Sequence, residues 1–250
     1  MGDRGMSSGG GDLDAARTVL AIDSATDSVV TGIVQLTGET VADVRALAER
    51  VVTDHRRHAE LLTTLIAECL AESGISRDAL AAVVVGCGPG PFTGLRVGMA
   101  TGAAFADALG LPAYGVCSLD ALALDTTPPA GRPDVLVVTD ARRREVYWAL
   151  YRDGARVRGP EVTAPAAVAD ELSPVFTAGE VGAASGSASH LELVGWTGAP
   201  PQATVPSARG LVAAAAPAII AGEIPEPLVP LYLRRPDAVE QKARKLGAAR

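Results

Sequence analysis

The sequence lacks any apolar run of about 18 residues, the length at which a segment becomes a candidate for a membrane-spanning helix. Its first residues also lack the apolar core of a signal peptide, and we interpret residues 1–16, which are rich in Gly, Ser and Asp, as a disordered leader. Cysteine is scarce: Cys69, Cys87 and Cys117 lie in apolar segments, which is typical of buried thiols in a reducing compartment. We therefore expect a cytoplasmic protein without a membrane segment.

Basic residues are also fewer than acidic ones. The formal net charge is −7, whereas a protein that binds nucleic acid without a partner protein usually presents a basic face. The composition therefore argues against a free-standing nucleic-acid-binding protein. Hydrophobic residues make up 48% of the 250 positions, which is enough for a sizeable core in one large domain or two smaller ones.

The first half of the chain alternates strand-like and helix-like patterns. Apolar or β-branched runs bounded by Gly, Pro and polar residues predict strands at Thr18–Asp23, Ser28–Leu36, within Val41–Val52, at Ala81–Val85 and at Leu111–Ser118. Helical patterns predict helices over Asp54–Ser73, closed by Gly74, and over Leu95–Leu109.

The second half repeats the opening pattern after a proline-rich linker, Asp125–Pro133. The predicted elements are strands at Val135–Asp140 and Glu145–Tyr151, a hairpin turn at Arg152–Gly154, a helix at Ala166–Leu172, a strand at Pro174–Ala178, a flexible loop at Gly182–His190, a strand at Leu191–Trp196, a helix at Ala208–Ala221 and an extended segment at Pro225–Pro230. Both halves thus predict a β-β-β-α-β unit, the mark of an internal duplication. We expect lobes at 17–122 and 123–222 and a C-terminal extension at 223–250.

Residues Gly86–Gly94 form a glycine- and proline-rich loop between a predicted strand and a predicted helix. A phosphate cradle can occupy such a position, because backbone N–H groups at a helix N-terminus attract anions. However, Pro89 and Pro91 carry no N–H, and no lysine follows. A structural elbow is favoured over phosphate binding. Its residues are Gly88, Gly90, Phe92, Thr93, Gly94 and Arg96.

The helix after this loop has an unusual face made of small residues. They recur at every fourth position: Gly94, Gly98, Gly102, Ala106 and Gly110. Glycine costs about 1 kcal/mol relative to alanine inside a helix, so this face indicates a very close neighbour. That neighbour is either another part of this chain or a helix of a partner protein. The preceding helix has apolar positions over about half its circumference, which also indicates packing on two sides.

Two aspartates end strands at matching places in the two units. Ligands of open α/β sheets bind beyond the carboxyl ends of strands, so Asp23 and Asp140, with Ser24 and Thr26, mark a candidate nucleotide site. The alternative is that each carboxylate caps a turn. For Asp140 a local salt bridge with Arg142–Arg144 is favoured, and those arginines could also meet an acidic partner or a phosphate.

Other chemistry has weaker signals. His55 and His58 could share a metal ion, but only His190 could join them as a histidine ligand, and packing of His58 is favoured. Cys87 and Cys117 have no flanking basic residue, and the Gly-x-Ser-x-Gly pattern of a hydrolase nucleophile is missing. We therefore predict no metal, no cofactor and no catalytic residue.

Several strings along residues 18–235 resemble the TsaB (YeaZ) family. They are Ile22-Asp-Ser-Ala-Thr-Asp-Ser28, His58-Ala-Glu-Leu-Leu62, Gly88-Pro-Gly-Pro-Phe-Thr-Gly-Leu-Arg96, Asp140-Ala-Arg-Arg-Arg-Glu-Val-Tyr147 and Leu231-Tyr-Leu-Arg234. The Gly-Pro-Gly string is the most specific of them. The resemblance implies an α/β, actin-like (ribonuclease H-like) fold of two related lobes, with mixed sheets flanked by helices.

The resemblance also implies a function. Members of this family are non-catalytic subunits of the complex that places threonylcarbamoyl on the tRNA adenosine next to the anticodon. They bind the TsaD transferase subunit, and the TsaE ATPase joins the complex. The resemblance thus implies that the chain interacts with tRNA only as part of the complex. The contact with TsaD, or with a second copy of the chain, would use the two helices. The candidate interface residues are His58, Leu61, Leu62, Leu65, Cys69, Leu95, Gly98, Met99 and Gly102.

The sequence departs from the family at two points. Pro91 stands where the family usually has Ser, which weakens a phosphate role for the loop. The turn after Asp23 lacks the glycine and lysine of ATP-hydrolysing actin-like proteins, so the nucleotide site is expected to be vestigial. The alternatives are a free-standing actin-like ATPase or kinase, and a metal-dependent peptidase.

Overall fold

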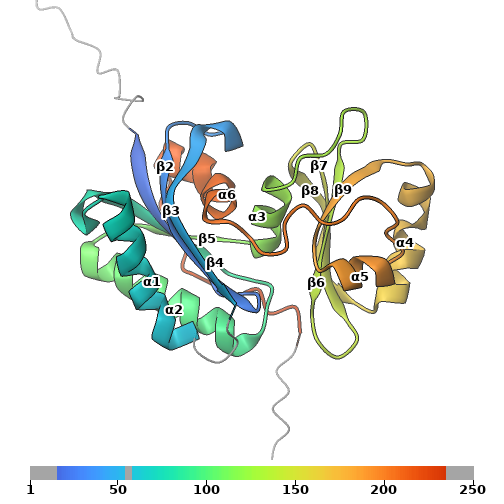
Figure 1. Cartoon of the computed structure of the whole chain (residues 1–250), viewed down its shortest axis with the longest axis horizontal. Coiled ribbons are helices and arrows are strands. Elements are labelled where there is room, and N and C mark those ends of the chain that lie inside the picture. The colour runs from blue at the N-terminus through green and yellow to red at the C-terminus, as the bar shows by residue number, and fades with distance from the viewer. Residues whose placement is uncertain (1–15, 54–57, 235–250) are drawn as a thin grey trace, which may run out of the picture.

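The computed structural model describes residues 16–53 and 58–234 (Figure 1). Three parts of the chain lie outside the described residues. They are most of the predicted leader, the segment 54–57 that includes His55, and the end of the C-terminal extension. The molecule consists of two mixed sheets and of helices that connect their strands. In the described part of the chain, no helix is long and apolar enough to cross a membrane.

The first sheet has the strand order β3-β2-β1-β4-β5. Three antiparallel strands come first: β1 (Arg17–Asp23), β2 (Ser28–Leu36) and β3 (Val44–Thr53). Helix α1 (His58–Ser73) then leads to β4 (Leu80–Gly86), and α2 (Phe92–Leu109) leads to β5 (Ala113–Val116). Strand β4 is parallel to β1, and β5 is parallel to β4. Short 3₁₀ turns, η1 (Val41–Asp43) and η2 (Arg77–Ala79), precede β3 and β4.

The second sheet repeats this plan with the order β8-β7-β6-β9. Strands β6 (Asp134–Asp140), β7 (Val146–Arg152) and β8 (Ala155–Thr163) are antiparallel, and β9 (Val181–Gly186) is parallel to β6. Helix α4 (Pro165–Thr177) joins β8 to β9, and α5 (Ala188–Leu193) follows. The predicted β-β-β-α-β duplication and the two-lobed fold class are confirmed.

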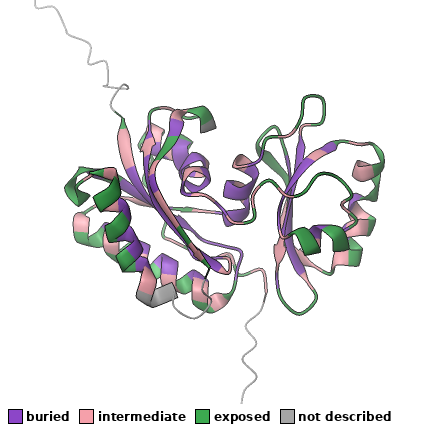
Figure 2. Cartoon of the chain, in the orientation of Figure 1, coloured by how far each residue is buried: buried purple, intermediate pink, exposed green. Residues whose placement is uncertain are grey.

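Five layers stack across the molecule (Figures 1 and 2). Helices α1 and α2 cover the outer face of the first sheet, and α4 and α5 cover the outer face of the second. Between the sheets lie α3 (Ser118–Leu124) and α6 (Ala208–Ala221), which pack against each other. Helix α3 packs on the second sheet and α6 on the first, so each lobe contributes a helix to the layer between them.

Helix α6 reaches the first sheet although the sequence places it with the second lobe. Its small and branched side chains, such as Ala208 and Leu211, share a core with β1 and β2. Gly32 of β2 makes this close approach possible, because a Cβ atom there would lie 2.6 Å from Cβ of Ala208. Near its C-terminal end the chain therefore returns from the second lobe to the first. The lobe boundaries stay a prediction from sequence.

Several predicted boundaries in the second lobe are wrong. Pro174–Ala178 is not a strand, because α4 continues to Thr177, and the strand is β9. The predicted loop at Gly182–His190 contains most of β9 and the start of α5. The predicted strand at Leu191–Trp196 instead begins with the end of α5. In the first lobe, α2 starts at Phe92 rather than Leu95, and the strand predicted to reach Ser118 ends at Val116, before the unpredicted α3.

Candidate functional site

The first strand-end carboxylate, Asp23, is completely buried at the carboxyl end of β1. It accepts a hydrogen bond from the Ala25 backbone N–H at 2.8 Å and another from the Ser118 hydroxyl. A Cβ atom on Gly86, the last residue of β4, would overlap the Asp23 carboxylate. Burial raises the pKa of Asp23 to about 6, and its two hydrogen bonds oppose that shift. Asp23 is therefore sealed inside the protein.

The Gly-Pro loop closes over the turn that follows Asp23. A Cβ atom on Gly90 would overlap the Ala25 carbonyl oxygen, so the loop needs glycine here. Ser24 ties the same turn to α2, because its hydroxyl donates to the Gly94 carbonyl at 2.7 Å and accepts from the Gly98 N–H at 2.9 Å. The loop and the start of α2 thus clamp the β1–β2 turn. Within the turn, the Thr26 hydroxyl donates to the Ser28 carbonyl and accepts from the Ser28 N–H.

The second strand-end carboxylate, Asp140, faces the gap between the lobes. The Arg142 N–H donates to its Oδ1 at 2.6 Å, and the Arg142 guanidinium lies 3.1 Å from its Oδ2. The predicted local salt bridge is therefore confirmed. The same guanidinium reaches Asp27 of the first lobe at 2.6 Å, and His190 Nε2 lies 3.5 Å from Asp140. Arg142 thus links the lobes and neutralises the carboxylate that a metal-bound nucleotide would need.

A cavity of about 210 Å³ opens at this point, and we call it the interlobe cavity. Its lining includes Thr26, Pro89, Pro91, Ser187 and His190. The volume lies below the roughly 300–1,000 Å³ of ordinary ligand pockets. Two of its walls are proline rings, which offer no N–H to a phosphate. The cavity suits a small polar molecule or water better than a nucleotide.

The turn after Asp140 has a strained backbone. Arg142, Arg143 and Arg144, which we call the arginine turn, have φ values of 62°, 55° and 64°. The left-handed conformation costs about 1–2 kcal/mol per residue when a Cβ atom is present. The turn is held by hydrogen bonds from the Glu145 N–H to the Arg142 carbonyl at 3.1 Å and from the Ala141 N–H to the Glu145 carbonyl at 3.1 Å. All three arginine side chains are exposed.

Most of the candidate interface residues lie in the core of the chain itself. Leu62, Leu65, Cys69, Leu95 and Met99 are buried between the helices and the first sheet. The glycine face also points inward: a Cβ atom on Gly98 would overlap Ser24 Oγ, and one on Gly102 would lie 2.5 Å from Val85. For these two glycines, the alternative in which the close neighbour belongs to this chain is the correct one. Leu61 is half-buried, and the side chain of His58 lies outside what is described.

The outward face of the two helices has a different composition from the one expected. Its exposed positions are mostly alanine and threonine, with Glu68, Glu72 and Asp107 at the C-terminal halves of the helices. We call this the alanine face: Thr63, Thr64, Ala67 and Ala71 of α1, and Ala100, Ala103, Ala104 and Ala108 of α2. Half-buried Leu61, Val97 and Phe105 pack beneath it.

Residues 223–234 form an extended strap that runs from α6 across the first lobe to the second (Figure 1). The Leu231 N–H donates to the Cys87 carbonyl at 2.8 Å, and the Tyr232 ring lies 4.5 Å from that of Phe92. Arg96 Nε donates to the Tyr232 hydroxyl at 2.7 Å. At its end, Arg234 donates to the Ala141 carbonyl at 2.9 Å. The strap thus fastens the start of α2 to the arginine turn.

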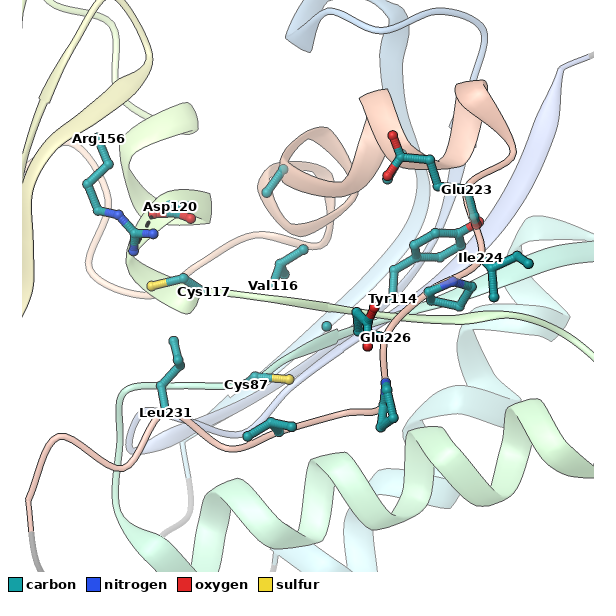
Figure 3. A pocket seen from close by; sticks show the side chains of 16 residues that line it. Cys87, Tyr114, Val116, Cys117, Asp120, Arg156, Glu223, Ile224, Glu226 and Leu231 are labelled. Atoms are coloured by element: carbon teal, nitrogen blue, oxygen red, sulfur yellow. Dashed lines mark hydrogen bonds and ion pairs between the residues drawn. The ribbon is translucent and has the colours of Figure 1, made fainter.

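A second cavity, of about 640 Å³, lies beneath the strap (Figure 3). Cys87 and Cys117 line it from the first lobe, and Asp120 pairs with Arg156 at its far wall. Burial raises the pKa of Cys87 to about 11 and that of Cys117 to about 12, so neither thiol is activated. Within residues 16–53 and 58–234, no group of His, Cys, Asp or Glu has the arrangement of a metal site.

Sequence reasoning missed the contacts of two residues that shape the site. His190 was noticed but assigned to a flexible loop, whereas α5 aims it at Asp140 and at the Ser187 hydroxyl, 2.7 Å from Nδ1. Tyr232 was visible only as part of a family string, and its contact with α2 joins residues far apart in the sequence. No local pattern could have found either contact.

The two lobes, the duplicated sheets and the cleft between them define an actin-like protein. A family model described as TsaD, tRNA N6-adenosine threonylcarbamoyltransferase, matches residues 45–226. This match covers more than half of the chain, so the chain belongs to that family.

Individual relatives place the chain more closely. It is 51% identical over 221 residues to uncharacterized protein Rv3421c of Mycobacterium tuberculosis, covering 88% of this chain and 93% of the relative. It is 36% identical over 97 residues to the tRNA threonylcarbamoyladenosine biosynthesis protein TsaB of Escherichia coli, covering 39% of this chain and 42% of the relative. That match thus spans less than half of the E. coli TsaB. A separate match, to the uncharacterized protein ML0378 of Mycobacterium leprae, covers 88% of this chain but only 55% of that relative.

A solved structure agrees with this placement. A Pseudomonas aeruginosa protein described as similar to peptidase YeaZ superposes with a TM-score of 0.71 at 27% identity, covering 87% of this chain and all of the other. The predicted likeness to the TsaB (YeaZ) family is confirmed.

Proposed function

We propose that this chain acts in the biosynthesis of threonylcarbamoyladenosine in tRNA, as a non-catalytic subunit that binds and activates the TsaD transferase subunit. The names of the TsaB relatives support the pathway, and one feature of the cleft supports the non-catalytic role. Both strand-end carboxylates are already engaged by the chain itself, Asp23 under Gly86 and Ser118, and Asp140 by Arg142. Neither is left to hold a metal-bound nucleotide.

The docking surface in this proposal is the alanine face of α1 and α2. Small side chains let another helix approach closely, and the half-buried Val97 and Phe105 beneath them offer apolar contact. The buried residues named from sequence support this face from below instead of touching the partner. A second copy of the chain could use the same face when TsaD is missing. The TsaE ATPase and tRNA would join through the assembled complex, and the cytoplasm is the expected location.

Reconstitution tests the proposal. Purified TsaD, TsaE and the enzyme that makes threonylcarbamoyl-adenylate are combined with tRNA, with and without this chain, and threonylcarbamoyladenosine is measured in the digested tRNA. We expect modification only when this chain is present, and no ATP hydrolysis above background by this chain alone. Full modification without the chain refutes the proposal. Rapid ATP turnover by the isolated chain would favour the free-standing ATPase or kinase, and a retained metal ion would favour the peptidase.

An arginine substitution locates the docking surface. Ala100→Arg with Ala104→Arg adds two long cations to the alanine face without disturbing the core, because both side chains are exposed. The matched control is Ala166→Arg with Ala167→Arg, which makes the same change on exposed positions of α4. We expect the first pair to reduce co-purification with TsaD at least tenfold and the control to leave it unchanged. Equal binding by both variants would move the interface elsewhere.

A further inference from the structure

The cavity of about 640 Å³ beneath the strap has no role in the proposed docking surface, and we call it the strap cavity. Its volume lies within the roughly 300–1,000 Å³ of ordinary ligand pockets, whereas that of the interlobe cavity lies below this range. It is also separate from the strand-end carboxylates, since neither Asp23 nor Asp140 lines it. The strap cavity is therefore large enough for a small organic molecule of its own.

The surface of the strap cavity is more apolar than polar. Val116 of β5 and the half-buried Ala214 and Ala218 of α6 line its inner part. Two strap residues line it from outside, Ile224 and Val229, whose side chains are 93% and 66% exposed. Exposed apolar side chains that gather at one place mark a surface that another molecule covers. An alkyl chain therefore suits this cavity.

The charged groups of the strap cavity are mainly acidic. Asp120, Glu223 and Glu226 line it, against the single guanidinium group of Arg156, which already pairs with Asp120 at 3.3 Å. Among the described residues, the carboxylates of Glu223 and Glu226 have no cationic partner. Figure 3 shows both glutamates and the Tyr114 ring on one side of the cavity, away from the Asp120–Arg156 pair. Carboxylates beside an aromatic ring suit an ammonium group, because both attract its positive charge.

The opposite end of the strap cavity has room for a second cation. Arg156 and the Tyr151 hydroxyl both contact Asp120 through Oδ1, at 3.3 Å and 2.7 Å, which leaves Oδ2 as a further acceptor. Three carboxylates and one guanidinium group give the lining a formal charge of −2. Acidic groups thus lie at both ends of a cavity whose middle is apolar.

The strap forms the outer wall of this cavity, and its backbone is restrained. Where the strap begins, the Tyr114 hydroxyl donates to the Glu223 carbonyl at 2.9 Å. Pro225 and Pro227 lie on either side of Glu226, and each proline ring fixes its own φ angle. The two glutamates therefore belong to a stiff segment, which lowers the conformational entropy that a ligand has to remove on binding.

We propose that the strap cavity binds a linear diamine or polyamine, with the alkyl chain along the apolar lining and the ammonium groups at the two acidic ends. This inference concerns the isolated chain and does not depend on the proposed function. An ammonium group carries three N–H donors on a compact positive charge, which suits separate carboxylates. A dicarboxylate of the same length meets the negative charge of the lining and is rejected.

Isothermal titration calorimetry of the full chain tests the proposal, with the seven-carbon diamine diaminoheptane as the probe. About 0.15 M salt screens the charges of the open surface. The variant Glu223→Gln with Glu226→Gln removes two carboxylates of the cavity, and both positions are exposed. The matched control, Glu39→Gln with Glu192→Gln, makes the same change of charge at exposed positions outside the cavity.

We expect the cavity variant to bind diaminoheptane about tenfold more weakly than the unchanged chain, because charge-assisted hydrogen bonds are lost, and the control to stay within about twofold. The four-carbon diamine putrescine should bind the unchanged chain about tenfold more weakly than diaminoheptane, because three fewer methylene groups are buried. Heptanedioate should give no saturable heat of binding. Ala218→Phe, which fills the cavity without changing its charge, should also weaken diamine binding about tenfold.

Several results overturn the proposal. One is the absence of saturable binding up to about 10 mM diaminoheptane. Another is an equal loss in the cavity variant and its control, which would reflect net charge alone. Equal affinity for the two diamines would place binding on the open surface, outside an apolar cavity. The melting temperature of each variant is measured as well, and if Ala218→Phe melts early, the glutamine variants and the two diamines decide the question.

Discussion

Replacing Asp23 by asparagine should stabilise the protein at neutral pH. Asparagine has nearly the shape of aspartate, so its oxygen can accept from the Ala25 N–H and its NH2 group can donate to the Ser118 hydroxyl. What the change removes is a buried negative charge. Burial raises the pKa of Asp23 from 3.8 to about 6. A difference of about 2 pKa units corresponds to about 3 kcal/mol of unfolding free energy.

The sign follows from which state ionises first as pH rises. The unfolded chain loses the Asp23 proton near pH 3.8, whereas the folded protein holds it until about pH 6. Ionisation therefore favours the unfolded state between these values, and the loss of stability is complete above them. Asp23→Asn cannot ionise, so its advantage over the unchanged protein should be close to zero near pH 4 and reach about 3 kcal/mol at pH 7.5.

The assay is urea unfolding of both proteins between pH 4 and pH 8, followed by far-UV circular dichroism and by the fluorescence of buried Trp148. Other groups titrate in both proteins, so the difference between them is the quantity to compare. Asp23→Ala serves as control, because it removes the charge but leaves the Ala25 N–H and the Ser118 hydroxyl without their acceptor. An asparagine variant that is less stable at pH 7.5, or an advantage that does not shrink towards pH 4, would refute the reasoning. In the reconstituted complex the asparagine variant should keep full tRNA modification, which a nucleotide-hydrolysing enzyme would lose.

Three further outcomes follow from the packing. Gly98→Ala should lower the free energy of unfolding by about 1–3 kcal/mol, because its Cβ would overlap Ser24 Oγ, and a variant as stable as the parent would contradict this. Leu62→Ala should lower it by about 2–5 kcal/mol, because the side chain is completely buried; a loss of partner binding without a loss of stability would place Leu62 on the surface after all. Cys87 and Cys117, with pKa values of about 11 and about 12, should resist a thiol-specific reagent at pH 8 until the protein is unfolded, and rapid labelling of the native protein would show that they are accessible.

The buried strands and the last helix could be predicted from the sequence because their patterns are local. Ser28–Leu36 is a β-branched run whose limits match β2, and Ala208–Ala221 matches α6 despite its internal Pro217. The repeat of an apolar strand ending in aspartate, at Asp23 and again at Asp140, was enough to predict the duplication. Such patterns predict the observed elements because each element depends on short-range backbone preference and on the need to bury a continuous apolar segment.

The end of the second lobe was mispredicted because its local signals contradict its tertiary setting. Strand β9 has the composition of a loop, yet Gly182 lies against the Arg132 carbonyl and Gly186 against the Val138 carbonyl, where larger side chains would not fit. The small residues that weaken its strand propensity are those that let it pack.

The sequence by itself determined that the chain has two related halves, and it singled out two helices with special faces, a rigid Gly-Pro loop and two strand-end carboxylates. Only the tertiary structure decided which way those faces point. Glycine spacing records that some backbone comes close, but not whose, and Gly98 and Gly102 turned out to face Ser24 and Val85 of the same chain. The same holds for charge, because Asp140 and Arg142 are close in sequence, whereas Arg234 reaches the arginine turn only through the folded strap. Contacts between distant residues depend on the whole packing arrangement, and a local pattern cannot contain them.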